Sequence, residues 1–142
     1  MDERLAHGLM ERLNADAQRI ARRFGLRYKE IAAERANVKR RYGVCFADGS
    51  IRIRLRHTLT GRSLKYSSLV NTLCHELAHL RHFNHGLRFR AFYRELLEFA
   101  RREGIYRPGS APVARELRRE PPAPREPARP SPSAGGTQLS LF

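Results

Sequence analysis

Three histidines and a glutamate in the stretch HELAHLRHFNHG, residues 75–86, have the types and spacing of a metal centre. On a helix, residues four positions apart lie one turn above each other, so His75 and His79 can direct two imidazole nitrogens at one metal ion. Glu76 lies beside them, and this HExxH pattern is the signature of zinc peptidases. The pattern therefore predicts a zinc ion bound by His75 and His79, with Glu76 as the general base.

A zinc ion in a hydrolytic site needs a third protein ligand and keeps one position open for water. His82 follows His75 by seven residues, which is about 10 Å along a helix axis and too far to share a metal. We therefore expect His82 to support the site or to lie at the surface. His85 follows the helix, where the chain can turn back, and we predict it as the third ligand. Glu95 and Glu98 are alternatives, although both also fit an ordinary charged helix surface.

The elements around the motif must position these side chains. Apolar residues recur at helical spacing over residues 5–24, and further helices are predicted over about 64–82 and 87–102. The run YGVCFADGSIRIRL, residues 42–55, alternates on both sides of an Asp-Gly turn and predicts two antiparallel strands, with a third strand from LRYKEIAA, residues 26–33. The predicted fold class is α+β, with a small antiparallel sheet packed on helices.

The chain divides into a folded part and a tail. All eight prolines lie at or beyond residue 108, where no apolar periodicity remains. We predict a folded domain over residues 1–107, a disordered linker over 108–137 and a terminal peptide over 138–142.

The motif and its flanks resemble a known group of enzymes. The runs NTLCHELAHLRHFNHGLRFRAF and KRRYGVCFADGSIRIRLRHTL are similar to the SprT-like and YgjP-like metallopeptidases, in which a hairpin precedes a helix carrying HELxH and an HxxxF element follows. His85 and Phe89 match that last element. The resemblance covers about residues 36–100 and implies a zincin-like fold in which Glu76 takes a proton from a zinc-activated water. Tyr42, Tyr66 and several arginines remain candidates for stabilising the oxyanion.

The charge balance predicts an anionic partner. Lys and Arg number 28 against 14 Asp and Glu, which gives a formal net charge of +14. On the second predicted hairpin strand, arginines alternate with Ile and Leu and so share one face. With the preceding basic triplet they form what we call the basic stripe, which consists of Lys39, Arg40, Arg41, Arg52, Arg54 and Arg56. We predict that the basic stripe binds DNA phosphates without reading sequence; a merely solvated strand face is the alternative.

The last five residues form a second motif. Gln138-Leu139-Ser140-Leu141-Phe142 resembles the bacterial sliding-clamp-binding motif of the form QL(S/D)LF. The resemblance implies that Gln138 hydrogen-bonds at the mouth of a clamp pocket while Leu139, Leu141 and Phe142 supply apolar anchors. An accidental apolar terminus and a degradation tag are the alternatives.

Together these features predict a zinc-dependent protease that acts near DNA on DNA-bound or DNA-crosslinked proteins and is recruited to the sliding clamp, in a design similar to the Spartan-type proteases. A metal-dependent hydrolase of a nucleotide or phosphoester, or a non-catalytic module for clamp or DNA binding, are the alternatives. Cys45 and Cys74 are too few for a disulfide scaffold, and the sequence has neither a signal peptide nor a membrane span. We expect a monomer in the cytoplasm, associated with the nucleoid.

Overall fold

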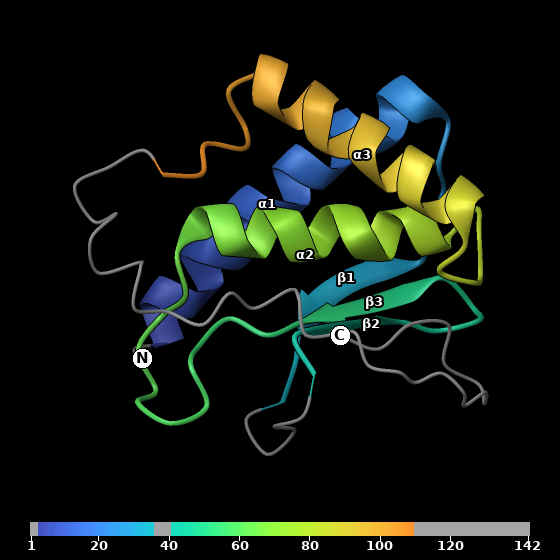
Figure 1. Ribbon diagram of the computed structural model, residues 1–142. Coiled ribbons are helices and arrows are strands. Elements are labelled where there is room, and N and C mark those ends of the chain that lie inside the picture. Colours follow the sequence, from blue (N-terminus) through green and yellow to red (C-terminus); the bar gives the residue numbers. More distant parts are fainter. Residues whose placement is uncertain (1–2, 36–40, 110–142) are drawn as a thin grey trace.

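The computed structural model of the chain describes residues 3–35 and 41–109. Three helices and three strands follow one another in the order α1 (Glu3–Phe24), β1 (Glu30–Ala33), β2 (Gly43–Cys45), β3 (Ser50–Ile53), α2 (Tyr66–His79) and α3 (Leu87–Arg102) (Figure 1). Three parts of the sequence predictions lie outside the described residues: Lys39 and Arg40, the predicted linker from residue 110 onward, and the peptide 138–142.

The strands form one small sheet in the order β1-β3-β2. β2 and β3 are the predicted antiparallel hairpin, and the turn between them places Gly49 at φ 94° while Asp48 Oδ1 accepts a hydrogen bond of 2.9 Å from the Ser50 amide. β1 pairs with the other edge of β3 in parallel, with Ile31 opposite Ile51. The sheet is therefore mixed and not purely antiparallel as predicted, because β3 pairs in parallel with β1 on one edge and antiparallel with β2 on the other.

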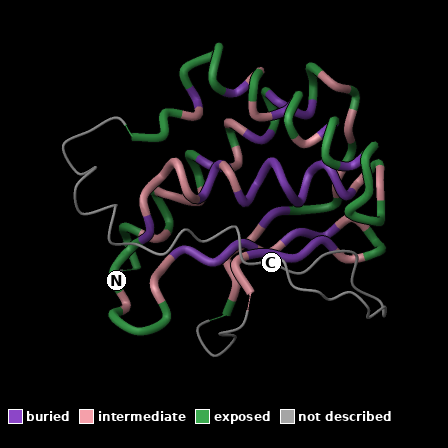
Figure 2. The backbone as a smooth tube through the Cα atoms, in the orientation of Figure 1, coloured by how far each residue is buried: buried purple, intermediate pink, exposed green. Residues whose placement is uncertain are grey.

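Helix α2 is the central element of the fold. It lies between the sheet and α3, and α1 crosses behind it (Figure 1). Figure 2 shows α2 buried along most of its length, and ten of its residues are buried, among them Leu73 and Leu77. The largest fully buried apolar side chains come from every layer and are Leu13, Ile20, Ile51, Ile53, Leu69, Leu73, Leu77 and Leu96. The central position holds α2 rigidly from both sides, so the motif that it carries is well positioned.

The end of α2 differs from the prediction. The helix stops at His79 instead of continuing to residue 82, because its last turn tightens: the Leu80 amide donates to the Leu77 carbonyl and the Arg81 amide to the Ala78 carbonyl, at 3.0 and 3.1 Å. The segment from 80 to 86 is therefore a loop that returns the chain to α3. None of the helices in the described residues is long and apolar enough to cross a membrane.

Candidate metal centre

Three histidines converge at the junction of α2 and α3, and we call them the histidine triad: His75, His79 and His85. The first two come from the C-terminal half of α2 and the third from the loop before α3. Their ligand atoms all lie within 4.8 Å of one another, and His79 Nε2 is 3.1 Å from His85 Nε2. Such a group of imidazole nitrogens fits a zinc ion with an open position. The alternative ligands Glu95 and Glu98 are exposed on α3 and are not part of the group.

A backbone carbonyl in the loop fixes the orientation of one ligand. His79 Nδ1 lies 3.0 Å from the carbonyl oxygen of His82. Because a carbonyl only accepts, Nδ1 carries the proton and Nε2 presents its lone pair toward the triad. The His82 ring packs edge-on against Phe92, at 5.8 Å between ring centroids. His82 therefore serves the site through its backbone, and this role depends on the early end of α2.

Phe89 forms the apolar floor of the site. Its ring stacks on His79 with centroids 4.3 Å apart, and it lies 5.0 Å from both His75 and His85. His79 is fully buried and His75 is 6% exposed, whereas His85 is open to solvent. Burial lowers the pKa of His79 to about 4, and burial together with the neighbouring His85 holds the pKa of His75 well below its usual range. Both rings are therefore neutral at neutral pH, which is the form that binds a metal.

Glu76 lies next to His75 on α2, where the helix contacts strand β2. Its carboxylate is fully buried, and Oε2 is 3.4 Å from His75 Nδ1. The neighbouring strand can come this close only because residue 43 is glycine: a Cβ there would lie 2.6 Å from Thr72 Cγ2 and 3.1 Å from Glu76 Oε2. Gly43 thus brings the edge strand β2 against the glutamate that the sequence predicts to be the base.

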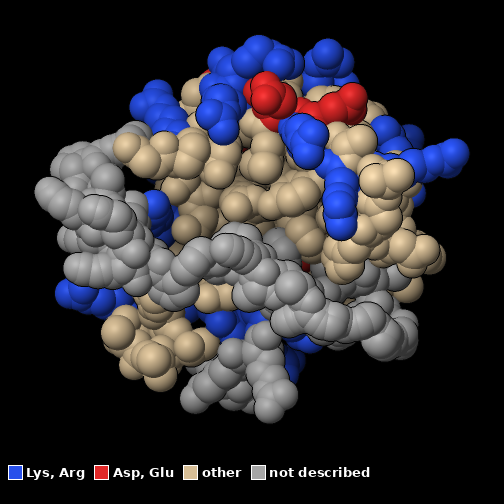
Figure 3. Space-filling model, in the orientation of Figure 1, with Lys and Arg blue, Asp and Glu red and all other residues tan. Residues whose placement is uncertain are grey.

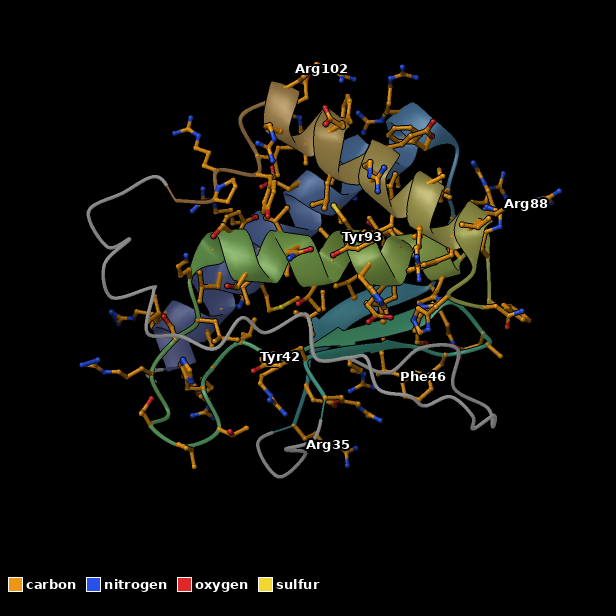
Figure 4. All side chains as sticks on the ribbon, viewed as in Figure 1. Arg35, Tyr42, Phe46, Arg88, Tyr93 and Arg102 are labelled. Carbon is orange, nitrogen blue, oxygen red and sulfur yellow. The ribbon has the colours of Figure 1, made fainter. Side chains whose placement is uncertain are left out.

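One tyrosine that the sequence analysis did not single out lies beside the histidine triad. Tyr93 belongs to α3 (Figure 4). Its ring packs edge-on against His75 at 5.2 Å, and its hydroxyl donates to the side-chain oxygen of Asn71. The sequence candidates are engaged elsewhere, since Tyr66 donates to Asp16 of α1 at 2.7 Å and the Arg54 guanidinium lies over the Tyr42 ring. An inward aromatic residue at helical spacing looks like ordinary core, so the sequence carried no signal for Tyr93.

The basic stripe is not a continuous row of exposed cations. Arg54 is only 7% exposed, its guanidinium lies 5.0 Å from the centre of the Tyr42 ring, and burial lowers its pKa. Arg41 Nε donates to Glu34 at 2.8 Å. The predicted alternation itself is correct, because the intervening Ile51, Ile53 and Leu55 are buried. The expectation that Arg54 faces solvent is wrong, because Tyr42 covers it; Arg52 and Arg56 are half-buried.

The fold and the site together define a zincin-like α+β domain with three histidines that could hold a metal ion. The chain belongs to the WLM domain family, whose profile matches residues 1–111. Its fold is similar to that of Wss1 from Saccharomyces cerevisiae: a crystal structure of a Wss1 mutant aligns with a TM-score of 0.65 and 17% sequence identity, over 74% of this chain and 87% of that chain. A second Wss1 structure aligns with the same score and identity over 72% and 84%. No curated protein sequence matches the chain.

Proposed function

We propose that this protein is a zinc-dependent peptidase that acts on proteins near DNA. The observation that carries the proposal is the histidine triad beside the buried carboxylate of Glu76. A structural zinc site is normally closed by four protein ligands, whereas three imidazoles leave a position for water and a nearby base gives that position a use. Membership of the WLM domain family and the fold shared with Wss1 agree with the resemblance to SprT-like metallopeptidases.

The histidine triad, Glu76 and Tyr93 have different roles in the proposed reaction. When bound by the histidine triad, zinc supplies a Lewis acid that polarises the scissile carbonyl and lowers the pKa of a water molecule to about 7. Glu76 accepts the proton of the attacking water and passes it to the leaving nitrogen. Tyr93 is our candidate for the hydrogen-bond donor to the substrate carbonyl oxygen, because its ring packs against His75; its hydroxyl would turn from Asn71 to the substrate when the substrate binds.

An extended peptide fits the geometry better than a compact phosphoester. β2 is an edge strand of the sheet in the described residues, and Gly43 on that strand lies against Glu76. An extended peptide can pair with such an edge as an additional strand, which would bring its backbone past the glutamate and the histidine triad. This edge favours peptide-bond hydrolysis over the alternative of nucleotide or phosphoester hydrolysis.

The partners follow from charge and from the tail. A net charge of +14 favours DNA, with Arg52 and Arg56 as the half-buried arginines of the basic stripe that remain candidates for phosphate contacts. The terminal peptide would bind the bacterial sliding clamp through Gln138 and the apolar anchors Leu139, Leu141 and Phe142, and would tether the enzyme there. Deleting residues 138–142 should abolish clamp binding in titration calorimetry and leave hydrolysis of a free peptide intact. Equal clamp binding by both forms would remove the recruitment role.

A substrate comparison tests the reaction. The zinc-loaded full-length protein would be incubated separately with an unstructured protein, with the same protein attached to single-stranded DNA, and with nucleotides, and the products identified by mass spectrometry. We expect peptide fragments from both protein substrates, with faster cleavage of the DNA-attached one. Phosphate release from nucleotides without any peptide fragments would refute the peptidase assignment.

A further inference from the structure

Asn71 is a polar residue on the face of α2 that carries the triad ligand His75. The two residues are four positions, and thus one helical turn, apart. Asn71 is half-buried, and its side-chain oxygen accepts a hydrogen bond from the hydroxyl of Tyr93 on α3. Asparagine is a weaker helix former than the leucine and glutamate residues of the same helix, so its contribution lies in this contact. The hydrogen bond joins the two helices at the edge of the histidine triad.

Aromatic neighbours hold the ring of Tyr93 in place. The ring packs edge-on against His75 and stacks on Phe89 at 5.8 Å between ring centroids, with the ring planes 29° apart. Phe89 in turn stacks on His79. The ring can therefore move little, whereas the hydroxyl proton can rotate about the C–O bond. A change of hydrogen-bond partner needs only this rotation.

The Tyr93 hydroxyl lies where a substrate can reach it. Tyr93 is partly exposed and lies near the middle of the face shown in Figure 4. In the same orientation, charged side chains gather along the upper border of this face, over α3, and the middle consists mainly of uncharged residues (Figure 3). In the described part of the chain, Asn71 is the hydrogen-bond partner of the hydroxyl. A substrate oxygen that arrives here therefore competes with Asn71 for the hydroxyl proton.

We propose that Asn71 is a positioning residue that restrains Tyr93 and so limits the rate of peptide hydrolysis. A phenol has one proton to donate, so Tyr93 cannot give it to Asn71 and to the substrate oxygen at the same time. The hydrogen bond with Asn71 must break before Tyr93 can stabilise the developing oxyanion. This inference rests on the proposed peptidase function and on the role of Tyr93 in it.

The strength of the hydrogen bond sets the size of the restraint. The net contribution of a hydrogen bond between neutral groups corresponds to a factor of about two to ten in an equilibrium constant. A charged acceptor forms a bond that is roughly twice as strong. Removal of the acceptor at position 71 should therefore speed hydrolysis by about two- to tenfold, and a carboxylate there should slow it by a similar factor.

Position 71 offers a matched series of variants, because leucine, asparagine and aspartate have the same number and branching of side-chain heavy atoms. Asn71→Leu removes the acceptor, and Asn71→Asp makes it an anion. The full-length, zinc-loaded proteins would be compared by kcat/KM on a free, unstructured peptide. This parameter compares the free enzyme with the transition state, so it includes the release of Asn71 at whichever step it occurs. We expect kcat/KM to rise about two- to tenfold for Asn71→Leu and to fall by a similar factor for Asn71→Asp.

The same two substitutions in Tyr93→Phe protein are the control. Without the hydroxyl there is no group to restrain, so the three proteins of this background should hydrolyse the peptide at equal, low rates. A direct effect of the new carboxylate on His75 or Glu76 would persist in this background and is separated in this way. A variant that only loosens α2 would lose activity together with melting temperature, so a structural role does not produce the faster hydrolysis expected of Asn71→Leu.

Binding of a transition-state analogue gives a readout that does not depend on turnover. A peptide in which a phosphinic acid group replaces the scissile amide presents tetrahedral oxygens like those of the transition state. In titration calorimetry with the zinc-loaded proteins, Asn71→Leu should bind this peptide about two- to tenfold more tightly than the parent, and Asn71→Asp should bind it more weakly. In the Tyr93→Phe background, the three affinities should be equal.

The contrary outcomes are distinct. If Asn71→Leu hydrolyses the peptide and binds the analogue no better than the parent does, Asn71 does not restrain Tyr93 and the inference is wrong. Equal effects in the presence and absence of the Tyr93 hydroxyl would also overturn it, because position 71 would then act on the site by another route. If the parent hydrolyses no peptide, the peptidase assignment fails, and the analogue titration still decides on the restraint. Equal affinities in the parent series, or no binding at all, would refute it.

Discussion

The close contact between β2 and α2 at Gly43 should contribute both to the stability of the fold and to the position of the Glu76 carboxylate. Replacing Gly43 by alanine tests these two contributions separately. The added methyl would lie 2.6 Å from Thr72 Cγ2, a distance at which atoms must move, and 3.1 Å from Glu76 Oε2. The same methyl would lie 3.3 Å from the backbone carbonyl oxygen of Arg52 on β3, so β2 cannot relieve the contact by shifting toward β3. The substitution therefore pushes β2 away from the helix or displaces the Glu76 carboxylate.

The size of the effect follows from two opposing terms. Overpacking of a closed contact costs about 1–3 kcal/mol, whereas removing a glycine from an extended segment gains about 0.4–1 kcal/mol by restricting the unfolded chain. We expect Gly43→Ala to lower the free energy of unfolding by about 1–2 kcal/mol, as the difference between these terms.

A double-mutant cycle identifies the atom responsible. Thr72→Ser removes Cγ2 and keeps the hydroxyl, at a cost of about 1 kcal/mol for one buried methyl. With the closest contact gone, the Gly43→Ala and Thr72→Ser double variant should be more stable than the sum of the single effects by about 1 kcal/mol. Its peptidase rate should remain low, because the contact with Glu76 Oε2 persists.

Urea denaturation of the zinc-loaded proteins gives the stabilities, and hydrolysis of a free peptide gives the rates. If the two substitutions have additive effects on stability, Thr72 Cγ2 does not limit how closely β2 packs against α2. Full activity of Gly43→Ala would show that Glu76 does not depend on this contact.

Three further predictions concern the metal site. His85→Ala should lose most of the bound zinc in metal analysis, while His82→Ala should retain it, because the carbonyl that orients His79 remains; exchanged results would overturn the ligand assignment. Tyr93→Phe should retain zinc and lower kcat about 10²–10³-fold with little change in KM, as expected for a donor to the developing oxyanion; an unchanged kcat would exclude that role. The pKa of His79 is 6.5 in an unfolded chain and about 4 in the folded protein. The metal-free protein should therefore lose stability as the pH falls through this range, because His79 binds a proton in the unfolded chain and stays neutral in the folded protein. His79 alone contributes a slope of about 1.4 kcal/mol per pH unit, and the buried His75 adds to it in the same direction. Urea denaturation at several pH values measures the slope, and a flat profile would show that neither ring is buried as a neutral group.

The features that the sequence predicted correctly are those that depend on residues close to one another in the chain. Helical periodicity gave the three helices with small errors at their ends, and the spacing of His75 and His79 placed both on one face of α2. The convergence of His85 followed from its position after the helix. These features depend on neighbours in the chain, which periodicity and spacing describe well.

The remaining features depend on contacts between distant segments. Alternation indicates which face of a strand is buried but not which edge another strand joins, so the parallel pairing of β1 with β3 was not predicted. The same alternation gave no warning that Tyr42 covers Arg54. The role of the His82 carbonyl could not be predicted either, since a backbone group has no signature in the sequence.

The central claim is that Glu76 acts as the base of a zinc peptidase, and one comparison tests it most directly. The parent protein and Glu76→Gln, each shown by metal analysis to contain one zinc per chain, would be incubated with a protein attached to single-stranded DNA, and the peptide fragments quantified over time. Loss of the base should slow cleavage by about 10²–10⁴-fold while zinc content and melting temperature stay unchanged. Fragments released at the parental rate by zinc-loaded Glu76→Gln would contradict the account.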